Sequence, residues 1–144
     1  MHVEFYVFEQ ANQQQAYIGL CQLIEKWYQA KLSVAVLCQT REELALLDQL
    51  LWTFNEQSFI PHAVLNTEEK LPPVLLCLDL SQLPDERNVV VNLSSMTLST
   101  HKASRFLAEI VFSEQTVQQL ARDRYKQYRD QGLQLKTIKI PLQQ

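Results

Sequence analysis

Glycine is scarce in this chain, and its scarcity excludes two large classes of nucleotide-binding site. The 144 residues include two glycines, Gly19 and Gly132, and neither follows the first hydrophobic segment. A dinucleotide-binding turn needs three closely spaced glycines, and a P-loop needs Gly-Lys-Ser/Thr at the start of a helix. Both motifs are absent, so the sequence predicts no phosphate-binding loop and no nucleotide cofactor.

Residues that bind metals or form disulfides are also few. The three cysteines, Cys21, Cys38 and Cys77, lie far apart among apolar residues, and no C-x-x-C or Cys/His ligand spacing occurs. We therefore expect reduced, buried cysteines and no metal site.

Evidence for catalytic residues is weak. A serine-histidine site would have to pair Ser94 or Ser95 with His101, but no Gly-x-Ser-x-Gly sequence surrounds either serine. The acidic residues of segment 79–86 follow a predicted strand, where α/β enzymes often place active sites, although a solvated acidic loop explains them more simply. The sequence favours no catalytic residue, and an enzyme on a nucleotide-binding-like fold stays open as an alternative.

Long apolar runs are missing, since none approaches the ~20 residues of a membrane span. The N-terminal segment 1–9 has no basic region and contains two glutamates, so it predicts a first strand and not a signal peptide. With 144 residues, we expect one domain covering residues 1–144, located in the cytoplasm.

Positive charge is concentrated near the C-terminus. The net charge is −3, but residues 1–100 hold five basic and twelve acidic residues, whereas residues 101–144 hold eight basic and four acidic residues. A net-acidic protein is a poor binder of duplex DNA, because phosphate neutralisation supplies most non-specific affinity. A local basic surface on such a protein suits an anionic peptide better.

Hydrophobic periodicity predicts strands that alternate with helices, as in a three-layer α/β/α domain with a mostly parallel sheet. We expect residues 137–144 to form the end of an edge strand and a frayed tail. The expected strands are Val3–Phe8, Ser33–Cys38, Phe59–Leu65, Val74–Leu78, Val89–Leu93, Ile110–Phe112 and Leu133–Ile140, and the expected helices are Gln13–Ala30, residues 41–54, Lys102–Ala108 and Glu114–Gln131.

Three signals mark helix ends. Thr40 and Glu43 have capping-box spacing at the start of the second helix, and Ser113 is placed to cap the last helix, with Thr116 as the competing cap. Gly132 is placed to end that helix in a left-handed turn.

The last helix carries an unusual stripe of side chains. At 100° per residue, Gln118, Arg122, Tyr125 and Arg129 fall within a narrow sector, with Lys126 beside them. Arginine binds carboxylates bidentately, and tyrosine offers a stacking surface, so the stripe suits an acidic peptide with an aromatic end. A solvated basic face is the alternative interpretation.

The stripe lies on the flank of the predicted buried face of this helix, which is formed by Val117, Leu120, Ala121 and Tyr128. Arg124 falls on the same side, and we expect its aliphatic stem to cover apolar surface.

Several segments along the chain form a recognisable combination: Phe5-Tyr6, Trp27, the Asp-Gln-Leu-Leu-Trp sequence of Asp48–Trp52, the Ser-Phe-Ile-Pro-His sequence of 58–62 and, above all, the helical segment Leu120–Arg129. In these segments the sequence resembles the chi subunit family of bacterial DNA polymerase III, and the resemblance covers nearly the whole chain. The resemblance implies a non-catalytic adaptor that binds the acidic, Phe-terminated tail of single-stranded DNA-binding protein (SSB). It also implies pairing with the psi subunit, which anchors chi to the clamp loader.

The resemblance assigns site residues for the tail. The family's tail-binding arginine and tyrosine match Arg122 and Tyr125, and a neighbouring basic position matches Arg129. A family lysine corresponds to Gln118, so one positive charge is replaced by an amide. Lys126 lies beside the stripe, and an apolar pocket wall falls at Val111 or Phe112.

The resemblance also places a psi-binding surface. The family's psi-contacting phenylalanine matches Phe59, and we expect Trp52, Ile60 and Pro61 to belong to the same surface. Composition alone would place Phe59 and Trp52 in the core. Direct binding of single-stranded nucleic acid by the basic C-terminal part is a further alternative function.

Overall fold

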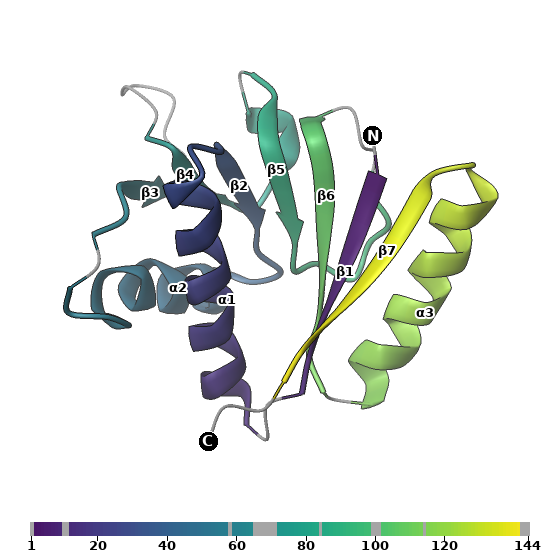
Figure 1. The fold of residues 1–144 in the computed structure, drawn as a ribbon, viewed down its shortest axis with the longest axis horizontal. Coiled ribbons are helices and arrows are strands. Elements are labelled where there is room, and N and C mark those ends of the chain that lie inside the picture. The colour runs from purple at the N-terminus through teal and green to yellow at the C-terminus, as the bar shows by residue number, and fades with distance from the viewer. Residues whose placement is uncertain are drawn as a thin grey trace.

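The computed structural model describes residues 2–9, 12–57, 59–64, 72–83, 85–98, 102–113 and 115–141. They form a parallel sheet covered by helices on both faces, which confirms the predicted α/β class (Figure 1). Several predicted positions lie outside the described residues: the strand end at Leu65, Ser58, His101, the helix start at Glu114 and the tail 142–144.

The sheet has seven strands in the order β3-β4-β2-β5-β6-β1-β7, and every neighbouring pair is parallel. The central strands are nearly continuous apolar sequences, as expected for strands buried on both faces. Their bounds are β1 His2–Phe8, β2 Val34–Leu37, β3 His62–Val64, β4 Val74–Cys77, β5 Arg87–Asn92, β6 Ala103–Val111 and β7 Gln134–Ile140.

Three α-helices form the outer layers. Helices α1 (Gln13–Gln29) and α2 (Arg41–Thr53) pack on one face of the sheet, and α3 (Gln115–Asp130) packs on the other face (Figure 1). Residues of β1 alternate between these faces: Tyr6 belongs to the core beneath α1 and α2, and Phe5 to the core beneath α3. A short 3₁₀ helix, η1 (Leu80–Gln82), lies between β4 and β5.

Helices α2 and α3 each show one of the predicted end structures. Thr40 accepts a hydrogen bond from the Glu43 N–H at 3.1 Å, which confirms the cap of α2. The Glu43 carboxylate accepts from the Gln39 N–H at 2.7 Å, one residue before the expected capping-box partner. Gly132 has a φ of 81°, which confirms the left-handed end of α3. The cap by Ser113 stays a prediction.

The helix predicted over Lys102–Ala108 is wrong, because residues 103–111 form the single long strand β6. This strand is central, between β5 and β1, and residues 106–111 are all buried. Burial on both faces removes the alternation that marks a strand in the sequence. The other elements match their predictions apart from shifts at the ends and the shorter β3.

Within the described ranges, no helix combines the length and apolar character needed to cross a membrane.

Candidate functional site: a basic groove between α3 and the sheet

A groove of about 970 Å³ runs between α3 and the edge of the sheet. One wall is α3, and the other is formed by β1 and β7, whose register pairs Phe5 with Thr137 and Val7 with Lys139. The groove includes Glu9 and Val111, at the carboxyl ends of β1 and β6. Open α/β sheets commonly bind ligands at this end of their strands.

The groove is apolar along part of its lining. Phe5, Val7, Val111 and Ala121 line it together with the ring of Tyr125. Tyr125 is half-buried, and its ring lies 5.3 Å from that of Phe5, at an interplanar angle of 53°. This surface can receive an aromatic or aliphatic side chain, because it offers flat rings beside branched aliphatic groups.

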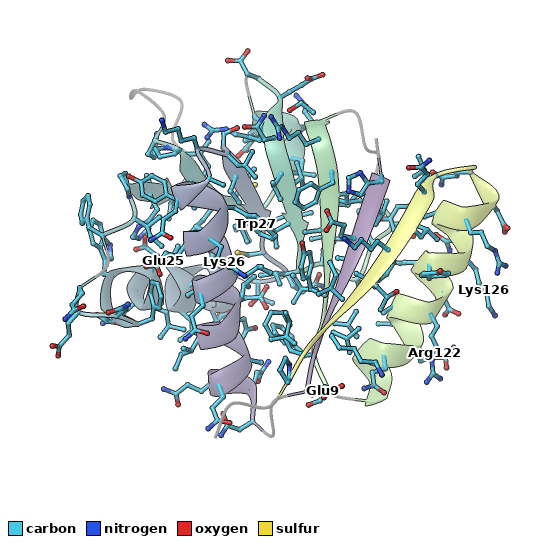
Figure 2. The ribbon with its side chains drawn as sticks, in the orientation of Figure 1. Glu9, Glu25, Lys26, Trp27, Arg122 and Lys126 are labelled. Carbon is cyan, nitrogen blue, oxygen red and sulfur yellow. The ribbon has the colours of Figure 1, made fainter. Side chains whose placement is uncertain are left out.

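Positively charged side chains surround the apolar surface. Arg122, Lys126 and Arg129 come from α3, and Lys139 comes from β7 on the other wall (Figure 2 labels the first two). Glu9 is the one carboxylate among the described lining residues. The groove therefore combines an apolar surface with an excess of positive charge.

The cations of the groove are largely free to bind a ligand. In the described part of the chain, no carboxylate lies within ion-pair distance of Arg122, Lys126 or Lys139. The Nε of Arg129 lies 3.9 Å from Asp130 Oδ1, but both side chains are exposed, and such a pair contributes little.

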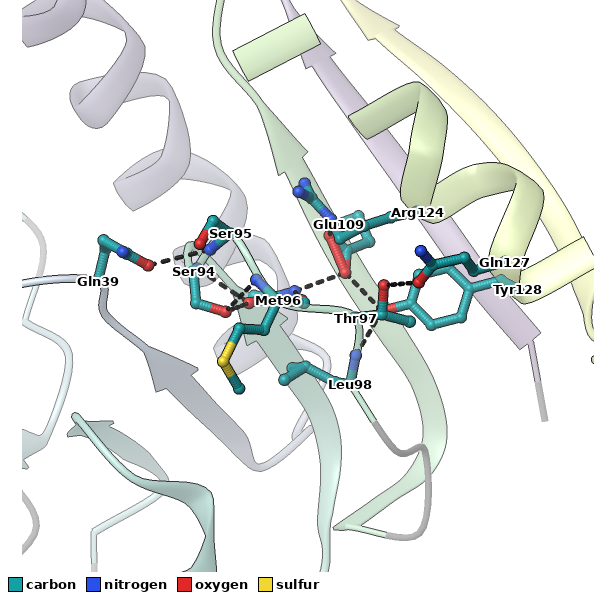
Figure 3. A network of polar contacts seen from close by, with 11 residues as sticks. Gln39, Ser94, Ser95, Met96, Thr97, Leu98, Glu109, Arg124, Gln127 and Tyr128 are labelled. Carbon is teal, nitrogen blue, oxygen red and sulfur yellow. Dashed lines mark hydrogen bonds and ion pairs between the residues drawn. The ribbon is translucent and has the colours of Figure 1, made fainter. Parts of the chain in front are cut away.

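The other side of α3 is held by a buried ion pair. Arg124 Nε donates to Glu109 Oε2 at 2.8 Å, and Tyr128 donates its hydroxyl proton to Glu109 Oε1 at 2.8 Å (Figure 3). Arg124 is buried as predicted. Its role goes beyond the predicted covering of apolar surface, because its guanidinium group also neutralises the fully buried Glu109 carboxylate. Burial raises the pKa of Glu109, and the charge of Arg124 opposes that shift.

The same network fixes the segment after β5. Asn92 Nδ2 donates to Glu109 Oε1 at 2.6 Å and to the Met96 carbonyl at 2.9 Å. The Leu98 N–H donates to the Tyr128 hydroxyl at 3.0 Å. Helix α3 is thus tied to the segment after β5, which fixes the direction in which the groove residues point.

The predicted stripe lies together in the structure. Gln118, Arg122, Tyr125, Lys126 and Arg129 all line the groove.

Two neighbouring predictions need adjustment. Leu120 was expected on the buried face of α3 and is 39% exposed, so that expectation is wrong. Of the two alternatives for an apolar wall, Val111 lines the groove. Phe112 instead packs against Phe8 and Tyr17 in the core beneath α1 and α2, because successive strand residues point to opposite faces.

Sequence reasoning missed the sheet wall of the groove. Phe5, Val7, Thr137 and Lys139 contribute to it because β7 pairs with β1. The alternation of β7 could have shown that Thr137 and Lys139 share one face, but no local signal identifies β1 as its neighbour.

The other predicted surface lies at the opposite edge of the sheet, near β3. Trp52 and Phe59 are 50% and 65% exposed, and their rings lie 5.5 Å apart. The expectation from composition that both lie in the core is therefore wrong. Pro61 is half-buried, and Ile60 is fully buried, so Ile60 supports this surface from beneath.

Three other polar side chains, those of His62, Asp79 and Ser94, have structural partners. Both ring nitrogens of His62 lie within hydrogen-bond distance of backbone carbonyls, those of Ile60 and Asp48. Asp79 accepts from the Ser81 N–H, which lowers the pKa of its carboxyl group. The hydroxyl of Ser94 donates to Asn92, and the arrangement with His101 lies outside the described residues.

Comparisons with known proteins agree with one another. The model of the family "DNA polymerase III chi subunit, HolC" matches residues 1–136. The DNA polymerase III subunit chi of Pseudomonas aeruginosa PAO1 is 29% identical over 140 residues, covering 96% of each chain. The subunit chi of Escherichia coli K12 is 28% identical over 114 residues, covering 78% of this chain and 77% of the relative.

One solved structure shows the fold alone. A chain in the S. cerevisiae assembly of Dbp5 with Nup159, Gle1, IP6 and ADP superposes with a TM-score of 0.66 at 12% identity, and the match covers 96% of this chain and 42% of that chain. The family model, by contrast, spans almost the entire sequence. The chain therefore belongs to the DNA polymerase III chi subunit family, and it is a replication accessory subunit.

Proposed function

We propose that this protein is a non-catalytic adaptor of the cytoplasmic replisome. In this proposal the groove between α3 and the sheet binds the acidic C-terminal tail of SSB. The surface around Phe59 binds the psi subunit, which links the protein to the clamp loader. No cofactor or metal is required, since both contacts are recognition events.

The observation that supports tail binding most strongly is the position of Arg122 and Arg129 on either side of Tyr125 along one groove. A guanidinium group can bind a carboxylate with two parallel hydrogen bonds and stays charged at every physiological pH. The half-buried Tyr125 ring and Phe5 provide the apolar surface for a terminal aromatic side chain. An acidic peptide that ends in phenylalanine matches both parts.

The separation of the two surfaces supports an adaptor. The groove uses β7, and the Phe59 surface lies beside β3, so the two sites are at opposite edges of the seven-stranded sheet. Two partners can then be bound at once without touching the same residues. An exposed pair of large aromatic side chains, such as Trp52 and Phe59, is typical of a protein interface.

The test is a titration with the last ten residues of the host's SSB. Wild type should bind, and binding should weaken with salt because the contacts are charge-assisted and partly exposed. Arg122→Ala should lose most of this affinity. Arg41→Ala, which removes an exposed arginine from the start of α2, should bind as wild type does. Failure of the wild type to bind would refute the proposal.

Direct binding of single-stranded nucleic acid is the second candidate that the groove supports, because its cations could also neutralise phosphates. The net charge of −3 argues against it. Titration with a fluorescent single-stranded oligonucleotide at low salt distinguishes the two functions, since only a nucleic-acid binder would give a saturable signal there.

A further inference from the structure

The sheet wall of the groove contributes a cation that the family assignment does not include. Lys139 lines the groove from β7, whereas the family-matched positions Arg122, Tyr125 and Arg129 all lie on α3. The family model ends at residue 136, so Lys139 lies beyond the part of the chain that this model matches.

Strand geometry directs Lys139 into the groove. In β7, Ile138 and Ile140 pack in the core beneath α1 and α2, so Thr137 and Lys139 point to the face that carries α3. The register pairs Lys139 with Val7, which belongs to the apolar lining. Lys139 is exposed and has no ion-pair partner within the described residues.

Lys139 also lies level with Gln118 across the groove. Gly132 reverses the chain between α3 and β7, so distances along both elements can be counted from it (Figure 1). Gln118 lies about 21 Å back along the helix at 1.5 Å per residue. Lys139 lies about 23 Å onward along the strand at about 3.3 Å per residue. The two side chains therefore belong to the same end of the groove.

We infer that Lys139 binds a carboxylate of the docked tail and supplies, from the opposite wall, the positive charge that Gln118 lacks. This inference rests on the proposed binding of the SSB tail. It makes Lys139 a determinant of affinity for acidic peptides. The carboxylate belongs either to an acidic side chain or to the end of the peptide.

Lys139→Met removes the charge and keeps the aliphatic stem. Tail affinity at low salt should fall about two- to fivefold, the range of a partly exposed charge pair, and its dependence on salt should become shallower. Lys136→Met is the matched control, because Lys136 is exposed on the same strand and points to the other face. This control should leave the tail affinity and its dependence on salt unchanged.

A rescue variant excludes an indirect structural effect. Gln118→Lys in the Lys139→Met background should restore affinity, because it returns a cation to the same end of the groove. Amidating the peptide terminus identifies the carboxylate: if Lys139 binds the terminus, Lys139→Met will not weaken binding of the amidated peptide further.

The outcomes separate the two proposals. If wild type binds, Arg122→Ala does not, and Lys139→Met binds as wild type does, then the role of Lys139 is refuted and tail binding stands. If Lys139→Met and Lys136→Met weaken binding equally, the loss comes from the change in the protein's net charge, and the role of Lys139 is again refuted. If wild type fails to bind, both proposals fall.

Discussion

Arg124 donates its Nε proton to Glu109 at 2.8 Å, and the two side chains are 5% and 0% exposed. This ion pair joins α3 to β6, the strand that the helix packs against. Tyr128 donates to the same carboxylate, one turn further along the helix (Figure 3). Because α3 is fixed at these two points, its groove-lining side presents Arg122 and Tyr125 at defined positions.

Removing either partner of this ion pair should destabilise the protein strongly. Glu109→Leu leaves the guanidinium buried without a carboxylate, and Arg124→Leu leaves the carboxylate without its counter-ion. Each should lower the free energy of unfolding by about 3–5 kcal/mol, as measured by urea denaturation. The double variant Glu109→Leu/Arg124→Leu should lose much less stability than the sum of the two single losses, because it leaves no buried charge without a partner. Additive losses would contradict the importance of the pair.

Phe59→Ala should weaken pairing with psi and leave tail binding unchanged. The side chain is 65% exposed and stacks near Trp52, so truncation removes interface area without opening a core cavity. Isothermal titration with psi measures the effect, which should exceed tenfold if Phe59 is an interface anchor.

Met96→Ala is the control for this prediction, because Met96 is also 65% exposed but lies in the segment after β5. It should bind psi as wild type does. Equal losses in both variants would show that the Phe59 surface is not specific for psi.

Substitutions at the C-terminal ends of α1 and α3 should change stability in opposite directions. Both helices end in the same hydrogen-bond pattern, with Lys31 (φ 64°) and Gly132 (φ 81°) in the left-handed conformation. Gly132→Ala should cost about 1 kcal/mol of stability, although its new Cβ meets no atom within 4 Å, because the strain lies in the backbone. Lys31→Gly should stabilise by up to about 1 kcal/mol. Thermal unfolding measures both, and shifts of the same sign would contradict this explanation.

The three cysteines should react slowly with thiol reagents in the native protein. Burial raises the pKa of Cys21 to about 12 and that of Cys77 to about 11, and it raises the pKa of Cys38 as well. The reactive thiolate is therefore scarce at pH 7.5. A Ser95→Cys variant provides an exposed thiol for comparison. Fast native labelling of three thiols in the wild type would contradict this prediction.

Local sequence signals were sufficient for α1, α2 and α3, because each has a periodic apolar face, and Thr40 and Gly132 also mark one end of α2 and of α3. They failed at β6, where Ala103–Val111 contains residues that also favour helices, such as Leu107, Ala108 and Glu109. A glutamate inside a central strand is accommodated here because Arg124 and Tyr128 reach it from α3 and Asn92 reaches it from β5. Such a long-range contact leaves no local pattern in the sequence.

The site was predictable on its helical wall and not on its sheet wall. The stripe from Gln118 to Arg129 follows from helix geometry alone. Lys139 and Thr137 reach the groove only because β7 lies beside β1, about 130 positions apart in sequence. Pairing between such distant strands depends on the whole topology, so neither residue could be assigned from its neighbours.

The strand order also determines when this binding site comes into existence during synthesis. Its sheet wall joins β1 and β7, the first and last strands along the chain. A nascent chain that stops before Gln134 has an unpaired β1 edge and lacks the part of the sheet wall that Thr137 and Lys139 form. The complete groove, and with it the tail binding proposed above, is therefore available only to chains synthesised through this strand.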